Sequence, residues 1–284
     1  MSTDQESTQN YLEKLWAGAP KDVLNIQGSM KFGDEMKYIT VKFDPKKYPK
    51  GIDIIHLTDV QYGHMSCNVE KFQNYLNWIL EEENRFIFFG GDMVDAATVL
   101  SVASPYENTK EPQGQVYDFV KLVMPIRHRV IGYVGGNHER RSSKAFGDLG
   151  HLIATLLKIP YSSGKQFVDI YYGNHQPHKN SLWHGGTGSK TKGSKAQMIH
   201  RFMTQGDSQV YWVGHLHDVM MIGDCREARG EGGTIKLEKF AGVMSSSFLE
   251  HYGTYAEVAG LPAGDTAMWL LHLDSNGKWQ LQIR

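Results

Sequence analysis

The chain has few cysteines and no long apolar run. Cys67 and Cys225 are its only two cysteines, and they lie far apart, which argues against a disulfide framework and favours a reducing compartment. No stretch approaches the roughly 20 consecutive apolar residues of a transmembrane helix. Residues 1–10 also lack the basic-then-apolar pattern of a signal peptide. These absences predict a cytoplasmic protein that does not associate with membranes.

An excess of charge is also absent. The 30 Lys and Arg residues nearly balance the 31 Asp and Glu residues, so overall charge does not indicate a nucleic-acid coat or a membrane patch. Cysteine-rich ligand sets are missing, which argues against a structural-zinc DNA-binding protein. We see no internal repeat and no long linker. We therefore predict a partly disordered N-terminal extension over residues 1–35 and a single domain over residues 36–284.

Five polar clusters punctuate the chain, and most of them end a short apolar run. Such runs between turn signals are typical of buried strands, so the clusters should lie on loops at the carboxyl ends of strands, where open α/β sheets bind ligands. The clusters are Asp59-Val60-Gln61, Gly91-Asp92-Met93-Val94-Asp95, Gly136-Asn137-His138-Glu139, Trp183-His184-Gly185 and Gly214-His215-Leu216-His217-Asp218. Aspartate, asparagine and histidine that converge from five strand ends indicate a polynuclear metal site.

The remaining patterns predict the layers around this site. Helical spacing follows Asn68, a plausible N-cap, up to Leu80, and further helices are expected near residues 116–125, 143–156 and 196–203. Strands dominate after residue 160. We expect residues 101–114 and the glycine-lysine loop 185–194 to be irregular. The predicted fold class is α/β: a mixed β-sandwich of two sheets flanked by helices.

The series Asp-x-Gln, Gly-Asp-x-x-Asp, Gly-Asn-His-Glu, His and Gly-His-x-His resembles the calcineurin-like metallophosphoesterase superfamily. The usual pattern there begins Asp-x-His and otherwise matches in order and type. The resemblance spans roughly residues 52–218, and the later strands fit the second sheet of the family's four-layer α/β/β/α fold. It implies an enzyme, a phosphoester hydrolase with two divalent metals about 3.5–4 Å apart and a metal-bridging hydroxide as nucleophile.

The resemblance also implies a ligand set. Asp92 would bridge the two metals, because each oxygen of a carboxylate can serve one ion. The first metal would be completed by Asp59, Gln61 and His217, and the second by Asn137, His184 and His215. Many neutral ligands beside few carboxylates leave the site with the net positive charge that a phosphate needs.

His138 is not counted among the ligands. Because its neighbour Asn137 serves the second metal, the His138 imidazole is expected to face the substrate as a general acid or transition-state donor, and Asp95 is expected to hold it. Such acid–base help is typically worth about 10²–10⁴-fold in rate. Asp95 could instead, or in addition, cap a short helix over residues 96–100.

Gln61 departs from the family pattern, which mostly has histidine there. A glutamine oxygen is a harder and weaker ligand than imidazole, so we expect manganese to be favoured, with magnesium, iron or zinc as alternatives. His64 is a disfavoured substitute ligand. A non-catalytic, protein-binding scaffold with a weakened first metal site is the alternative from another class. It is disfavoured because all the other ligands and His138 remain.

Ala96 is the second departure, since the phosphoprotein phosphatase branch has a phosphate-gripping arginine there. The absence of this arginine favours a phosphodiesterase over a phosphomonoesterase. Arg140 and Arg141 either bind the substrate phosphate or are solvated residues at a helix start. Lysines in and after the 185–194 loop suit a phosphate backbone. A nuclease acting on DNA or RNA is therefore the first substrate hypothesis, and a small phosphodiester is the second.

Overall fold

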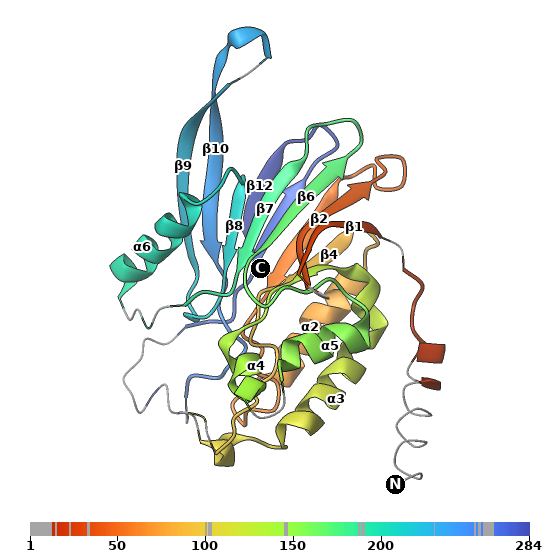
Figure 1. The fold of residues 1–284 in the computed structure, drawn as a ribbon, viewed down its shortest axis with the longest axis vertical. Helices are drawn as coiled ribbons and strands as arrows, with labels where there is room; N and C mark the ends of the chain where they lie inside the picture. The colour runs from red at the N-terminus through yellow and green to blue at the C-terminus, as the bar shows by residue number, and fades with distance from the viewer. Residues whose placement is uncertain are drawn as a thin grey trace.

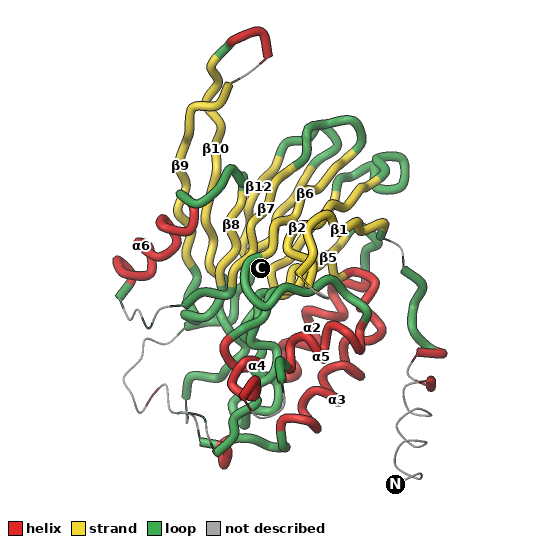
Figure 2. Tube along the Cα trace, in the orientation of Figure 1, coloured by secondary structure: helices red, strands yellow, loops and turns green. Residues whose placement is uncertain are grey.

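The computed structural model describes residues 13–14, 16–22, 24–32, 35–99, 101, 104–144, 147–186, 188, 191–229, 231–252, 254, 257 and 264–284. Within these residues two mixed β-sheets pack together, and helices cover the outer faces (Figures 1 and 2). The predicted α/β fold class is confirmed. The expected disorder of residues 1–10 lies outside the described residues.

The five-stranded sheet has the strand order β12–β11–β3–β4–β5. Strands β3, β4 and β5 run parallel to one another, and β5 is the edge strand. On the other side of β3, β11 is antiparallel to β3 and β12 is antiparallel to β11. Its strands are β3 (Ile52–Leu57), β4 (Arg85–Phe89), β5 (Val130–Tyr133), β11 (Trp269–Leu273) and β12 (Trp279–Ile283). Because β3, β4 and β5 are parallel, their carboxyl ends meet at one edge of the sheet.

The seven-stranded sheet has the order β1–β2–β6–β7–β8–β10–β9. Its central strands β7, β8 and β10 are parallel, and β9 is antiparallel to β10. Its strands are β1 (Asn25–Phe32), β2 (Glu35–Phe43), β6 (Gln166–Tyr172), β7 (His178–Trp183), β8 (Val210–Val213), β9 (Met220–Arg229) and β10 (Ile235–Met244).

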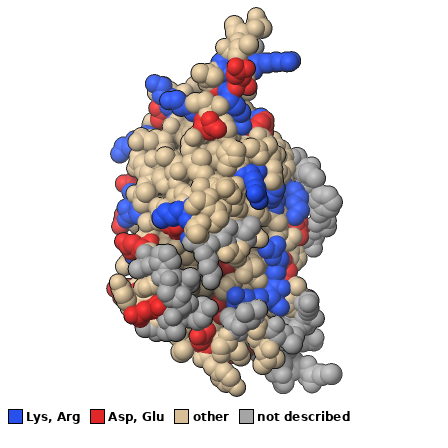
Figure 3. Space-filling model, turned by 90° about the vertical axis from the view of Figure 1, so that its left-hand side faces the viewer, with Lys and Arg blue, Asp and Glu red and all other residues tan. Residues whose placement is uncertain are grey.

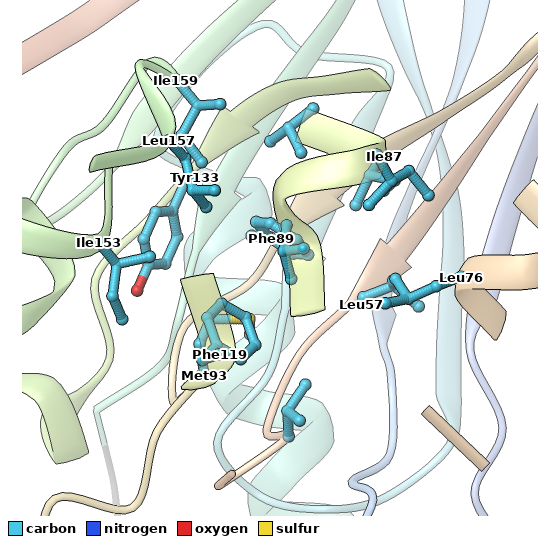
Figure 4. Packing of buried hydrophobic residues seen from close by; sticks show 14 of the residues in the cluster. Leu57, Leu76, Ile87, Phe89, Met93, Phe119, Tyr133, Ile153, Leu157 and Ile159 are labelled. Atoms are coloured by element: carbon cyan, nitrogen blue, oxygen red, sulfur yellow. The ribbon is translucent and has the colours of Figure 1, made fainter. Parts of the chain in front are cut away.

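Helices cover both sheets. Three pack on the five-stranded sheet through a core that includes Phe89, Phe119 and Ile153 (Figure 4): α2 (Val69–Leu80), α3 (Pro112–Val123) and α5 (Leu149–Leu157). The other outer face is covered by α6 (Lys192–Met203). Between the sheets, Phe86, Phe88 and Trp212 belong to a second core. Short helices complete the chain: α4 (Asn137–Arg141), η1 (Pro105–Glu107), η2 (Met124–Arg129), η3 (Ser142–Lys144) and η4 (Glu231–Gly233).

Several expectations about single elements were correct and others were not. Asn68 caps α2, since its Oδ1 accepts a hydrogen bond from the backbone N–H of Lys71 at 2.7 Å. In contrast, α3 begins at Pro112, inside the stretch that was expected to be irregular. Pro112 does not prevent this start, since proline is tolerated in the first turn of a helix. β1 lies inside the predicted N-terminal extension, yet it pairs with β2. No helix follows Asp95 over residues 96–99, so Asp95 is not a helix cap.

No helix within the described ranges is long and apolar enough to cross a membrane.

Candidate metal centre

The predicted ligands lie on loops that follow strands of both sheets. Asp59 and Gln61 come after β3, Asp92 after β4, and Asn137 begins α4 just beyond β5. From the seven-stranded sheet, His184 follows β7, while His215 and His217 follow β8. Backbone hydrogen bonds join the loops: Asp59 N donates to Gly91 O at 2.9 Å, and Gln61 N donates to Asp92 O at 2.8 Å. The five clusters therefore converge, as their sequence positions predict.

Asp92, His184 and His215 form one compact group that could hold a metal ion, with potential ligand atoms all within 4.8 Å of one another. Asp92 and His184 are almost fully buried. His184 Nε2 lies 3.0 Å from Asp92 Oδ2 and 3.1 Å from Asn137 Oδ1. The group therefore brings a carboxylate, an amide oxygen and two imidazoles to one point.

The hydrogen bonding of His184 fits a cation at this point. Its Nδ1 lies 2.7 Å from Gly90 O, a carbonyl that can only accept, so Nδ1 carries the proton. In neutral His184 the lone pair of Nε2 therefore faces two oxygen acceptors, Asp92 Oδ2 and Asn137 Oδ1. Only a proton or a metal ion between Nε2 and these oxygens makes the contacts favourable. Burial lowers the pKa of His184, but the Asp92 carboxylate outweighs burial and raises it to about 9. Without a metal, the proton occupies the place.

Asp59, Gln61 and His217 form a second group beside the first. Asp59 Oδ1 lies 3.1 Å from His217 Nε2, and Gln61 Nε2 lies 3.2 Å from the same nitrogen. Burial raises the pKa of Asp59, but His217 and then His184 hold it below its usual range. A carboxamide binds a cation through its oxygen, so Gln61 would have to present its other end to a metal. Gln61 thus lies beside His217, with its amide nitrogen rather than its oxygen on that side.

His138 lies between two carboxylates and a guanidinium. Its Nδ1 is 2.9 Å from Asp95 Oδ1, and its Nε2 is 3.6 Å from Asp92 Oδ2 and 2.7 Å from Arg141 Nη2. Burial lowers the pKa of His138, while Asp92 and Asp95 outweigh burial and raise it. Arg140 instead donates to Ser163 O at 2.8 Å. Of the two arginines predicted to bind substrate, Arg141 is therefore the one beside the reactive imidazole.

The ligand loops have an unusual backbone. Among the described residues, seven non-glycine residues have positive φ, and five of them are predicted ligands: Asp59, Gln61, Asp92, His215 and His217. This left-handed conformation is costly for residues with a Cβ atom and is often found at functional sites. Gly91 has a φ of 95°, and a Cβ atom there would lie 2.6 Å from His184 Nδ1. Glycine is therefore required where the chain passes closest to His184.

Glu139 is a residue of the site that our sequence reasoning left without a role. It is fully buried, and its carboxylate accepts hydrogen bonds from the backbone N–H groups of Asp92 (3.0 Å), Met93 (2.6 Å) and Gly136 (3.0 Å). The Tyr133 hydroxyl donates to it as well, at 2.9 Å. Burial and the nearby Asp92 raise the pKa of Glu139 to about 7. Glu139 thus fixes the two loops that present Asp92 and Asn137.

Lys195 is a second such residue. It is buried, and its Nζ donates to Leu216 O at 3.0 Å and to Asp218 Oδ2 at 3.1 Å. Leu216 lies between His215 and His217, so this contact holds the loop that carries both histidines against α6. We had grouped Lys195 with residues that suit a phosphate backbone. Its contacts show a residue that is already engaged inside the protein, and the spacing of the sequence could not reveal this.

Two mixed β-sheets with helices on their outer faces are the architecture that the resemblance in the sequence predicts. No family model matches the chain, and no curated protein matches it. Similar solved structures include a metallophosphoesterase from Sphaerobacter thermophilus, with 13% identity over 82% of this chain and 87% of that chain and a TM-score of 0.41. Vps29 from Chaetomium thermophilum matches with 10% identity over 82% and 96% of the two chains and a TM-score of 0.35.

An NAD nucleotidase from Haemophilus influenzae matches with 12% identity over 82% of this chain and 49% of that chain, with a TM-score of 0.38. At identities of 10–13% and TM-scores of 0.35–0.41 these matches carry no argument, so the function has to be argued from the site itself.

Proposed function

We propose that this protein is a metal-dependent phosphoester hydrolase that acts on phosphodiesters. The observation that carries the proposal is the convergence of Asp92, His184 and His215 within 4.8 Å, with the Nε2 lone pair of His184 directed at oxygen acceptors. A cation is needed where this lone pair and these oxygen atoms meet. A donor set of carboxylate, amide and imidazole groups suits a divalent metal such as manganese.

The two neighbouring groups support two ions. The first would be held by Asp59, Gln61 and His217, and the second by His184, His215 and Asn137, with Asp92 shared. When bound, the ions supply an activated water for attack on phosphorus and neutralise charge on the phosphoryl oxygens. The protein's own part is to fix the ligand loops through Glu139 and Lys195, so that little rearrangement is required when metal and substrate bind.

His138 is the proposed general acid. Asp95 accepts from its Nδ1, while its Nε2 accepts a hydrogen bond from Arg141 Nη2 at 2.7 Å. Nε2 therefore carries the proton for the departing oxygen only after Arg141 has turned from it to the substrate phosphate. Asp92 and Asp95 outweigh burial and raise its pKa above the usual value. Arg141, next to Nε2, is placed to bind a non-bridging phosphate oxygen, and it would take the role that an arginine at the position of Ala96 has in phosphoprotein phosphatases.

The surroundings favour a small phosphodiester over a long nucleic acid. Lys192 and Lys195 both pair with Asp218, and Arg140 contacts Ser163, so three of the basic residues near the site already have partners. On the face that includes α6, positive and negative side chains are interspersed (Figure 3). The nuclease hypothesis is therefore the second arm of the test.

The test is turnover by metal-stripped protein to which manganese, magnesium, iron(II) or zinc is returned. The substrates are bis(p-nitrophenyl) phosphate, p-nitrophenyl phosphate, and single-stranded and duplex DNA. We expect diester hydrolysis that exceeds monoester hydrolysis, with little cleavage of DNA. Asp92→Asn should abolish it, whereas Asp224→Asn, at an exposed aspartate on β9, should not. Absence of turnover with every metal would contradict the proposal and favour the non-catalytic scaffold.

A further inference from the structure

β9 and β10 form an arm that extends beyond the sheet. All ten residues of β9 pair with β10, from Met220 opposite Met244 to Arg229 opposite Ile235. β10 in turn pairs with β8 only over its last four residues, Ala241–Met244. The remaining halves of the two strands are a two-stranded ribbon that projects from the body (Figures 1 and 2). An isolated two-stranded ribbon is only marginally stable in water, so a partner would stabilise the arm.

One face of the arm exposes several apolar side chains beside charged ones. Ile235 and Leu237 are each 73% exposed, and Met221 is 52% exposed. They share a face with Val243, because side chains alternate along a strand and Met221 is opposite Val243. Val243 is buried in the core between the sheets. The face of β10 that is buried at Val243 thus continues into solvent, where Lys239 separates the exposed Ile235 and Leu237 from the core.

The outer edge of β9 is open for pairing. β9 is the last strand of its sheet, and no other strand of the described chain pairs with it besides β10. The backbone N–H of Cys225 donates to the carboxylate of its own neighbour, Asp224, at 2.7 Å. A second strand that pairs with β9 would replace this local contact of the Cys225 amide. Open edges of this kind readily accept a strand from another chain.

We propose that β9 pairs antiparallel with β9 of a second copy of this chain, across a two-fold axis at Cys225. In this register Asp224 lies opposite Arg226 of the second copy, and Arg226 lies opposite its Asp224. Registers centred on residue 224 or 226 lose both of these opposite-charge pairs. Directly opposite charges of unlike sign stabilise antiparallel strands, and like charges destabilise them. The sequence of β9 is thus complementary to itself in one register.

The same register improves the surroundings of the exposed residues. Arg226 already pairs with Glu238 of β10 at 2.8 Å, so Asp224 of the second copy would complete a row of alternating charges. Met221 would lie opposite Arg229 of the second copy, whose aliphatic stem would then lie between Met221 and Ile235 of that copy. The contact is isologous and closes as a dimer, so it does not propagate into a fibre.

Oligomeric state tests the proposal, measured by light scattering during gel filtration over a range of concentrations. We expect a dimer. Asp224→Arg and Arg226→Asp should each place like charges opposite one another and weaken the dimer by about tenfold or more. The double variant restores the opposite charges and should restore the dimer. Glu227→Arg, a charge reversal on the same strand but opposite Gly223, is the matched control and should dimerise normally.

Cross-linking gives a second measurement that does not depend on the charge variants folding. Directly opposite residues in an antiparallel pair have Cα atoms about 4.5–5.5 Å apart, within the range of a disulfide. Mild oxidation should therefore give a covalent dimer through Cys225, which is exposed. Cys225→Ser should abolish this dimer and Cys67→Ser should retain it, since burial raises the pKa of Cys67 to about 12. A monomer at every concentration, or a dimer unaffected by both charge reversals, would overturn the proposal.

Discussion

Metal binding at Asp92, His184 and His215 should release a proton from His184. The Nδ1 proton of His184 is held by Gly90 O, so a second proton can only be on Nε2, 3.0 Å from Asp92 Oδ2, where a metal would bind. The neighbouring carboxylate raises the pKa of His184 to about 9, even though burial opposes it. The metal and the proton therefore compete for the same lone pair.

The size of this competition follows from the pKa. Two pH units below a pKa of about 9, roughly one molecule in a hundred has the neutral histidine, so metal affinity should rise close to tenfold between pH 7 and pH 8 and about 50-fold between pH 7 and pH 9. The metal-free protein should show the opposite trend in stability. A pKa raised above its unfolded value stabilises the fold fully below about pH 6.5, and this contribution of about 3 kcal/mol is lost as the pH rises through 9.

Titration calorimetry with manganese or magnesium at pH 7.5, in two buffers of different ionisation enthalpy, counts the released protons. We expect the wild type to release about one proton more than His184→Gln, whose side chain does not titrate. His272→Ala removes a histidine that pairs with Asp53, away from the ligand loops, and should leave the count unchanged. Equal proton release by wild type and His184→Gln, with metal affinity independent of pH, would refute this account of His184.

Substitutions at His138, Glu139, Lys195 and Gln61 test the other roles, with Lys192 as a control. His138→Ala should retain bound metal, as metal analysis can check, and its rate of phosphodiester hydrolysis should fall by about 10²–10⁴-fold, as a turnover assay can check. Glu139→Gln places an amide against backbone N–H donors and should lower the free energy of unfolding by about 2–4 kcal/mol and weaken metal binding, as measured by urea denaturation and calorimetry. Lys195→Met should weaken metal binding more than Lys192→Met does, and Lys195→Arg should restore it in part. Gln61→His should tighten the first metal; unchanged affinity and metal preference would remove Gln61 from the ligand set.

The sequence was most informative where local pattern decides structure. The apolar runs before Asp59 and before Gly214 form strands β3 and β8, and the polar residues after them converge at one end of the two sheets. β9 was not predicted, because an exposed edge strand that alternates charged and small residues has no apolar run. The start of α3 was placed too late, because the polar residues before it resemble a loop.

The contacts that support the site could not be read from the sequence. Glu139 was visible as part of a motif, but its hydrogen bonds to the loop of Asp92 depend on how β4 and β5 lie side by side. Lys195 looked like one more basic residue near a flexible loop, and only the packing of α6 brings it to Leu216. The roles assigned to the ligands, His138 and Asp95 remain predictions, and the geometry now makes them testable.

A crystal structure of the protein with bound manganese, with anomalous scattering recorded at the manganese edge, tests the central claim most directly. We expect two anomalous peaks about 3.5–4 Å apart, with Asp92 between them, His184 and His215 on one side and Asp59 and His217 on the other. A single peak bound by Asp92, His184 and His215 would contradict the dinuclear site and remove the first metal. No peak at these residues would contradict the metal centre as a whole.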